Sequence, residues 1–201
     1  MKKLFYFVLF GYIIIVFTGC KQRKAKKPNI LFIMSDDHTF QGIGAYDDPR
    51  FSDLDITPTI DRLAEEGMIF ENVFCTNSIS TPSRATIMTG QYNHTNGMRD
   101  FWDSPLLPSE QYLSNELNKA GYQTAMIGKW HLGPEPESFD YYNVLPAQGS
   151  YHNPVLYSQD EGDWRQVHTY YWDKNLRIKE YQGHSSDVLT DITLDWLKNK
   201  R

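Results

Sequence analysis

Positive charge is scarce in most of this chain. Residues 28–201 hold 13 Lys and Arg against 25 Asp and Glu, a net charge of −12, because seven of the 20 basic residues lie within the first 27 positions. Nucleic-acid binding needs a basic surface, so this composition argues against a nucleic-acid partner. An anionic substrate would have to be held by a local group of cations, since the overall field of the protein repels it.

The apolar run at the start of the chain is also short. Residues 4–17 follow the basic Met1-Lys2-Lys3 and precede Thr18-Gly19-Cys20. A membrane-spanning helix needs ~20 apolar residues, so the run is short for a span, although an ordinary N-terminal anchor is the alternative interpretation. A basic start, a short apolar stretch and small residues before a cut predict a secretory signal over residues 1–19.

The end of this signal resembles the lipobox of bacterial lipoproteins, in which cleavage occurs before a cysteine that carries the lipid. Phe17 departs from the smaller aliphatic residues usual at its position. The resemblance implies a lipid on Cys20, a basic spacer over residues 20–28, and a protein exported and anchored in the bacterial envelope. Membrane contact would then run through the lipid anchor.

Cysteine is scarce as well, since the chain has only two. With Cys20 assigned to the lipid, Cys75 stands alone, and no intrachain disulfide framework can form. We expect Cys75 to be a small buried apolar residue.

Hydrophobic patterning alternates between strands and helices along the rest of the chain. Apolar or alternating runs predict strands over 29–35, 68–74 and 123–127. Capping signals predict three helices: one from Pro58, with Thr57 as N-cap and Gly67 as stop; one from Ser109 to Gly121; and one after Ser185 or Ser186, with Val188, Ile192 and Trp196 on one face. Residues 134–183 are rich in Pro, Gly, Tyr and Trp and predict long loops, with short strands as the alternative.

This alternation predicts an α/β fold over residues 29–201, with a largely parallel central sheet flanked by helices. Ligands of such sheets gather at the carboxyl ends of the strands. Three groups of polar residues follow predicted strands: Asp36-Asp37, Ser80 to Arg84, and Lys129 to His131. We expect these groups to form one site.

Each group has a functional and a structural interpretation. Asp36 and Asp37 are adjacent carboxylates that suit a hard divalent cation, but Asp is also a common turn residue. Asp47-Asp48 is a similar pair, and there a turn is favoured. Lys129 and His131 could bind an anion, or they could be a surface lysine and a packed histidine.

The run Ser80-Thr81-Pro82-Ser83-Arg84 is expected to enter a helix that ends at Gly90. Thr81 would be the cap and Pro82 the first helical residue, which places Ser80 just ahead of the helix. The free N–H groups there stabilise developing negative charge, and Arg84 adds a fixed cation. The structural alternative is a hydroxyl-rich cap with a surface arginine.

Two longer motifs give this chain a resemblance to the sulfatases of the alkaline phosphatase superfamily. Ser80-Thr-Pro-Ser-Arg84 with Met88-Thr89-Gly90 resembles the modification motif of that family in its serine form, and Gly128-Lys-Trp-His-Leu-Gly133 resembles a second family motif. The strand that begins at Pro28-Asn29-Ile30 and leads to Asp36-Asp37 is similar to the start of the family. The resemblance covers roughly residues 28–200 and implies an alkaline-phosphatase-like fold.

The resemblance also implies roles for the site residues. Ser80 would be oxidised to formylglycine by a bacterial radical enzyme, and its aldehyde hydrate would expel sulfate by reforming the aldehyde. One calcium ion would be bound by Asp36, Asp37 and the modified Ser80. Arg84 would hold this cluster, Lys129 would bind sulfate, and His131 would assist proton transfer.

The implied activity is hydrolysis of sulfate esters on a glycan, similar to the branch that removes 6-sulfate from N-acetylglucosamine. Members of the family are more than twice this long, so the chain is expected to be the truncated N-terminal part of the catalytic domain and inactive alone. The alternatives are a phosphodiester or phosphonate hydrolase of the same superfamily, and a non-catalytic lipoprotein that binds glycan through the aromatic stretch from Tyr141 to Trp172. His38 could reach substrate, whereas His94 is expected to be a structural hydrogen-bonding residue.

Overall fold

The computed structural model describes residues 26–51, 53–100, 106, 111–133, 135–159, 162–168 and 173–200. They belong to two compact units, Met1–Phe70 and Glu71–Arg201. The predicted signal over 1–19 and the predicted lipid attachment at Cys20 lie outside these ranges. In the described part of the chain, no helix is long and apolar enough to cross a membrane.

The first unit contains three short helices: η1 (Phe40–Gly42), η2 (Gly44–Tyr46) and α2 (Pro58–Glu66). Helix α2 has the predicted bounds, with Pro58 at its start and Gly67 after its end. Thr57 occupies the N-cap position, but its hydroxyl makes no capping bond. It accepts from the Gly44 N–H at 2.8 Å and donates to the Asp61 carboxylate at 3.0 Å, so it joins α2 to η2 instead.

The strands predicted over 29–35 and 68–74 are not present, so this prediction was wrong. Their apolar side chains lie in solvent, with Ile33 76% exposed and Phe74 88% exposed. A strand persists only where a neighbour accepts and donates its backbone hydrogen bonds, and no described segment pairs with either run. An apolar pattern alone was therefore not sufficient to predict a strand.

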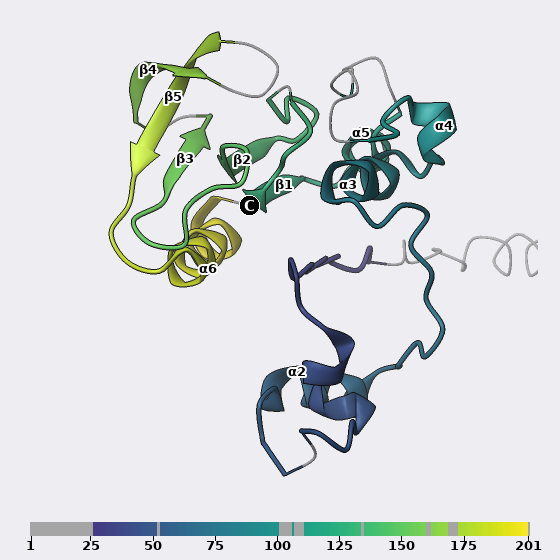
Figure 1. Cartoon of the computed structure of the whole chain (residues 1–201). Coiled ribbons are helices and arrows are strands. Elements are labelled where there is room, and N and C mark those ends of the chain that lie inside the picture. The colour runs from purple at the N-terminus through teal and green to yellow at the C-terminus, as the bar shows by residue number, and fades with distance from the viewer. Residues whose placement is uncertain are drawn as a thin grey trace, which may run out of the picture. The chain divides into compact units, whose positions relative to one another are not determined.

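The second unit is built around a five-stranded sheet, ordered β1-β2-β3-β5-β4. Its strands are β1 (Ala125–Lys129), β2 (Tyr141–Leu145), β3 (Val155–Ser158), β4 (Asp163–His168) and β5 (Asp173–Glu180) (Figure 1). β1 and β2 are parallel, whereas the other adjacent pairs are antiparallel. The α/β class with flanking helices is confirmed, and the described sheet is mixed.

The antiparallel strands of the mixed sheet come from residues 134–183, for which the sequence analysis favoured long loops. This stretch contributes β2 to β5. Its tyrosine and valine residues suit a pleated, half-buried surface. Tyr141, Tyr142 and Tyr157 are each 7% exposed. Because these rings are buried in the protein, they are not available to stack on a sugar, and this part of the glycan-binding alternative is not supported.

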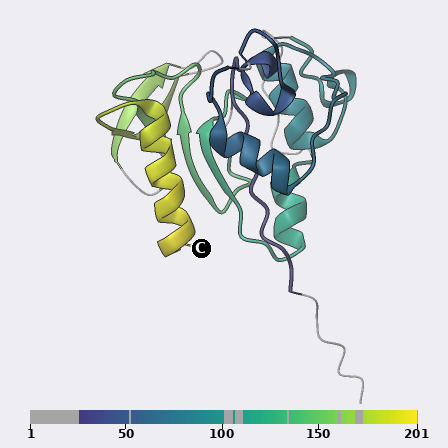
Figure 2. The ribbon, with the colours of Figure 1, turned by 90° about the horizontal axis from the view of Figure 1, so that it is seen from below.

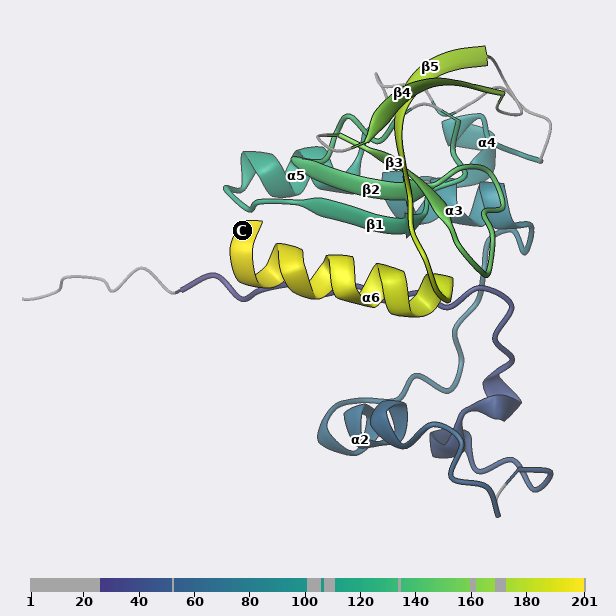
Figure 3. The ribbon, with the colours of Figure 1, turned by 90° about the vertical axis from the view of Figure 1, so that its left-hand side faces the viewer.

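Helices cover both faces of the sheet in the second unit. One cluster of buried side chains includes Tyr142 and Val144 of β2 with Ala85 of helix α3 (Ser80–Thr89). The alternate residue Leu145 packs with Leu156 against Val188 of α6 (Ser185–Asp195), which a π-helical turn, η3 (Trp196–Lys200), extends. Figures 2 and 3 show α6 and α5 (Leu113–Lys119) on opposite sides of β1 and β2. β2 is accordingly buried along its whole length.

The predicted helices are present, but three of their starts differ from expectation. α3 begins at Ser80 with Ile79 as N-cap, so Thr81 is not the cap and Pro82 is not the first helical residue. α5 begins after Tyr112, and Ser109 lies outside the described residues. α6 is capped by the His184 ring, whose Nδ1 accepts from the Ser186 N–H at 3.2 Å.

The predicted apolar face of α6 is confirmed. Val188 is buried, Ile192 packs beside it, and the ring of Trp196 stacks on Tyr141 with centroids 6.4 Å apart. Cys75 differs from expectation because it is exposed. Its thiol donates to the carbonyl oxygen of Asn77 at 2.7 Å, so it belongs to a surface turn and not to the core.

Candidate active site at the start of helix α3

Ser80 is the first residue of helix α3. The first helical hydrogen bond runs from the Ser83 N–H to the carbonyl of Ile79 at 3.0 Å. The helix closes at Gly90, whose left-handed φ of 66° and bond to Thr86 match the predicted stop. The amide groups of the first turn and the helix dipole make the surroundings of Ser80 favourable for negative charge.

Arg84 links the start of this helix to the end of a strand. Its Nε donates to Ser80 Oγ at 3.3 Å, and one terminal nitrogen donates to the backbone carbonyl of Lys129 at 2.7 Å. Arg84 is only 9% exposed, so its cation is held in a fixed position by its partners. Residues 45 positions apart in sequence thus meet at one point, as the sequence predicted for the second and third polar groups.

Lys129 is the last residue of β1, and its ammonium group reaches a neighbouring loop. Its Nζ donates to Oε1 of Gln148 at 2.7 Å. β1 and β2 run parallel, with Lys129 in register with Leu145. Lys129 and the loop after Leu145 therefore lie at the carboxyl-end edge of these two strands, where ligands of α/β sheets bind.

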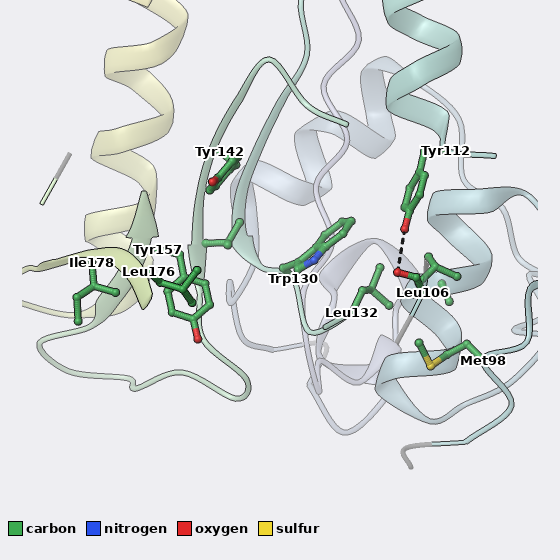
Figure 4. Close-up of a cluster of buried hydrophobic side chains, with 11 residues drawn as sticks. Met98, Leu106, Tyr112, Trp130, Leu132, Tyr142, Tyr157, Leu176 and Ile178 are labelled. Carbon is green, nitrogen blue, oxygen red and sulfur yellow. Dashed lines mark hydrogen bonds between the residues drawn. The ribbon is translucent and has the colours of Figure 1, made fainter. Parts of the chain in front are cut away.

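His131 lies two residues beyond the strand and is buried, at 5% exposure. Its φ of 56° is left-handed, which is uncommon for a residue with a side chain. Trp130 and Leu132 on either side of it belong to the core cluster, together with Tyr112 (Figure 4). Packing of these two neighbours holds the chain in a turn that an isolated peptide would avoid.

Two asparagines that sequence reasoning missed fix the backbone around Ser80. Asn77 Oδ1 accepts from the Ile79 N–H at 3.0 Å, just before the helix. Asn93 is buried, and its Nδ2 donates to the carbonyl of Pro82 at 2.8 Å. Asn is a common turn residue, so neither position carries a signal in the sequence that separates it from an ordinary loop.

His94 does not have the expected structural role. It is exposed, and its ring stacks on Tyr92 with centroids 5.8 Å apart. The buried hydrogen-bonding residues are its neighbours Asn93 and Asn96, and Asn96 Nδ2 donates to Thr89 Oγ1 at 3.2 Å. The expected role belongs to the asparagines of this short segment.

The predicted metal ligands Asp36 and Asp37 belong to the first unit, whereas Ser80, Arg84, Lys129 and His131 belong to the second. Both carboxylates are exposed, and Asp37 has a left-handed φ of 54°. Exposed paired carboxylate oxygens fit a calcium ion chemically. In the part of the chain that the structure describes, no group of three or more His, Cys, Asp or Glu is placed to hold a metal.

The other residues singled out in the first unit form local structure. The ring of His38 is 3.4 Å from the carbonyl of Gly42, so it folds back on its own loop. The favoured turn at Asp47-Asp48 is confirmed, since the Phe51 N–H bonds the Asp48 carbonyl at 2.9 Å. The Arg50 guanidinium, which donates to the Asp48 carboxylate, lowers the pKa of that carboxyl to about 2.

A buried tyrosine pair lies on the β2–β3 part of the sheet. The Tyr142 hydroxyl donates to Glu135 Oε2 at 2.7 Å, in the loop that follows Gly133. Burial, with the nearby negative charge of Glu135, raises the pKa of the Tyr157 hydroxyl to about 12. Both tyrosines act as core residues with one polar end.

A family model described as Sulfatase matches residues 28–201. The chain is 38% identical to an N-acetylglucosamine-6-O-sulfatase of Bacteroides thetaiotaomicron over 183 residues, which are 90% of this chain and 29% of that protein. It is 31% identical to an N-acetylgalactosamine-6-sulfatase of Homo sapiens, over 86% of this chain and 36% of that protein. The chain thus spans about a third of the length of these relatives.

A solved structure shares the fold of this chain with a TM-score of 0.74 and 37% sequence identity, over 88% of this chain and 32% of the other. That protein was solved in complex with its substrate D-glucosamine-2-N,6-O-disulfate. The match to the family model includes residues of both units, since it begins at residue 28.

Proposed function

This chain belongs to the sulfatase family, and from that premise we propose that its protein hydrolyses sulfate esters of glycans through Ser80. The observation that carries the proposal is the position of Arg84, which bonds Ser80 Oγ and the carbonyl of Lys129 at once. One buried cation thereby joins the residues of both sulfatase-like motifs. The structural alternative, a hydroxyl-rich helix cap with a surface arginine, does not account for an arginine that bonds both Ser80 and Lys129.

We further propose that Ser80 is converted to formylglycine by a radical maturation enzyme. Oxidation of the Ser80 side chain removes two hydrogens and leaves an aldehyde at the first position of α3. The amide groups of the first turn and the Arg84 guanidinium would then stabilise negative charge on the hydrated group. Serine unchanged would be left esterified by sulfate and would need a second attack to be released.

The other residues of the site would act on the sulfate and its protons. Lys129 would hold a sulfate oxygen as a point charge at the end of β1. His131 would transfer a proton, because imidazole can serve as a general acid or base. A calcium ion held by Asp36, Asp37 and the modified Ser80 would polarise the sulfate oxygens as a Lewis acid.

The proposed substrate is a glycan that carries 6-sulfate on N-acetylglucosamine. Support comes from the 38% identity to a protein named N-acetylglucosamine-6-O-sulfatase and from the solved neighbour with its 6-O-sulfated glucosamine substrate. We also propose that a lipid on Cys20 anchors the protein in the bacterial envelope, where such glycans are met. Residues 1–27 carry seven basic residues and the apolar run that support this placement.

The test is sulfate release from N-acetylglucosamine-6-sulfate by the whole protein that carries this chain, produced in an anaerobic host with the maturation enzyme. We expect turnover by the wild type and a loss of roughly a thousandfold or more in Ser80→Ala. Ser78→Ala is the matched control, because Ser78 is an exposed serine two residues ahead of the helix. Equal activity of wild type and Ser80→Ala would overturn the proposal.

A further inference from the structure

The loop after β2 places one side chain on the ammonium group of Lys129. Gln148 Oε1 accepts a hydrogen bond from Lys129 Nζ at 2.7 Å, although the two residues are 19 positions apart. Gln148 is exposed, so the contact lies at the surface of the second unit where a ligand can reach it. No sequence motif pointed to Gln148.

The backbone of this loop is fixed by a tight turn. The Gly149 N–H bonds the Pro146 carbonyl at 2.8 Å, and Ala147 has a left-handed φ of 46°. Gly149 has a φ of 75°, and a Cβ there would come within 3.0 Å of the Leu145 side chain. A glycine is therefore required, and the turn carries Gln148 beside the end of β1.

Gln148 supplies an acceptor without supplying a charge. A lysine ammonium has three N–H donors on a flexible four-carbon stem, so one fixed acceptor restricts where the other two point. A carboxylate in the same place would neutralise the ammonium and compete with an anionic ligand. An amide oxygen orients the cation and adds no negative charge of its own.

We propose that Gln148 is a positioning residue of the sulfate subsite, which acts through Lys129. It holds the ammonium at the carboxyl-end edge of β1 and β2, the edge at which the proposed function places the sulfate group. This inference rests on the proposed function. It adds a residue from the loop after β2 to a site otherwise made by α3 and β1.

Three substitutions in the whole, matured protein test the inference. Gln148→Glu places a negative charge on the ammonium, and we expect KM for N-acetylglucosamine-6-sulfate to rise roughly tenfold or more while kcat stays within about twofold. Gln148→Met keeps the length and removes the acceptor, and Gln148→Ala removes both. For these two we expect KM to rise by roughly two- to fivefold, because the cation stays but loses its orientation.

Gln182→Glu and Gln182→Ala are the matched controls, since Gln182 is an exposed glutamine in the loop before α6. We expect their KM to equal that of the wild type. If Gln148 had only a structural role, its substitutions would lower the melting temperature or kcat. The larger rise in KM for Gln148→Glu than for Gln148→Met would then have no explanation. Unchanged KM in Gln148→Glu, or an equal rise in Gln182→Glu, would overturn the inference.

Binding of inorganic sulfate, followed by calorimetry, separates this inference from the proposed function. If the wild type releases no sulfate from esters, the proposed function fails, and sulfate binding then decides on Gln148. Weaker sulfate binding by Gln148→Glu than by Gln182→Glu supports the positioning role. Equal binding by the two variants, or no sulfate binding by the wild type, overturns it.

Discussion

Each of the two units of this chain contains an apolar run, but the run is exposed in the first unit and buried in the second. In the first unit, no described residue is buried, and the run from Ile30 to Met34 is 41–76% exposed. In the second unit, the five residues of β2 are all buried. β2 has hydrogen-bonded strands on both edges and packed side chains on both faces, whereas the earlier run has neither among the residues that the structure describes. A strand is thus defined by its neighbours as much as by its own residues.

The largest expected consequence of this contrast is in backbone hydrogen exchange. Amides of β2 open only with the second unit as a whole, whereas amides of residues 29–35 make no strand hydrogen bonds. We expect protection to differ by roughly a thousandfold or more, as measured by exchange and mass spectrometry. Strong protection of residues 29–35 would break the comparison and would mean that this run pairs in solution.

A matched pair of leucines measures the same contrast as stability. Leu156 in β3 is fully buried, and Leu31 is 66% exposed. We expect Leu156→Ala to lower the free energy of unfolding by about 2–5 kcal/mol, since it leaves a cavity. Leu31→Ala should change it by about 0.5 kcal/mol or less. Denaturant titration of both variants gives the comparison, and similar losses would contradict it.

A polar contact inside the second unit is expected to have a smaller effect. Asn93→Ala removes two hydrogen bonds at a buried side chain, from Nδ2 to the Pro82 carbonyl and from the Thr76 hydroxyl to Oδ1, so we expect a loss of about 1–3 kcal/mol in the free energy of unfolding. The exposed Asn72 supplies the control, and Asn72→Ala should have no measurable effect. If Asn93→Ala matches its control, the first turn of α3 is held by something other than Asn93.

The smallest expected effect appears only in alkaline solution. The pKa of Tyr157 rises from 10.0 to about 12 on folding, so the unfolded chain releases this proton first as the pH rises. Its stabilising contribution is complete below pH 10 and is lost between pH 10 and about 12. The free energy of unfolding of Tyr157→Phe should therefore fall by up to about 2 kcal/mol less than that of the wild type over that pH interval. Melting curves with Tyr151→Phe, a ring 79% exposed, as control would detect the difference.

Local signals in the sequence were sufficient for several elements. The stop at Gly90, the bounds of α2 and the apolar face of α6 follow from residues within a few positions of one another. The capping residues of α3 and α6 could not be identified in this way. Ile79 occupies the N-cap position of α3 without a side-chain capping bond, and its own N–H is held by Asn77. The cap of α6 is the ring of His184.

In the candidate site, too, some features could be predicted from the sequence and others depend on contacts between distant residues. The sequence predicted that Ser80, Arg84 and Lys129 would lie together, and Arg84 does bond both of the others, although the strand expected ahead of Ser80 is not present. The contacts of Asn93 with Pro82 and of Gln148 with Lys129 could not be predicted from the sequence. Both residues lie in segments whose conformation depends on packing with residues distant in sequence. Asp36 and Asp37 were identified by charge and position alone, and their role as metal ligands stays a prediction.

The central claim is that Ser80 serves as the precursor of an aldehyde at the start of α3. Mass spectrometry of the peptide that contains Ser80, from protein made in an anaerobic host with the maturation enzyme, tests it most directly. We predict a loss of two hydrogens at Ser80 and none at the neighbouring Ser83 or at Ser78. Serine found unmodified at position 80, under conditions in which a known serine-type sulfatase is converted, would contradict the account.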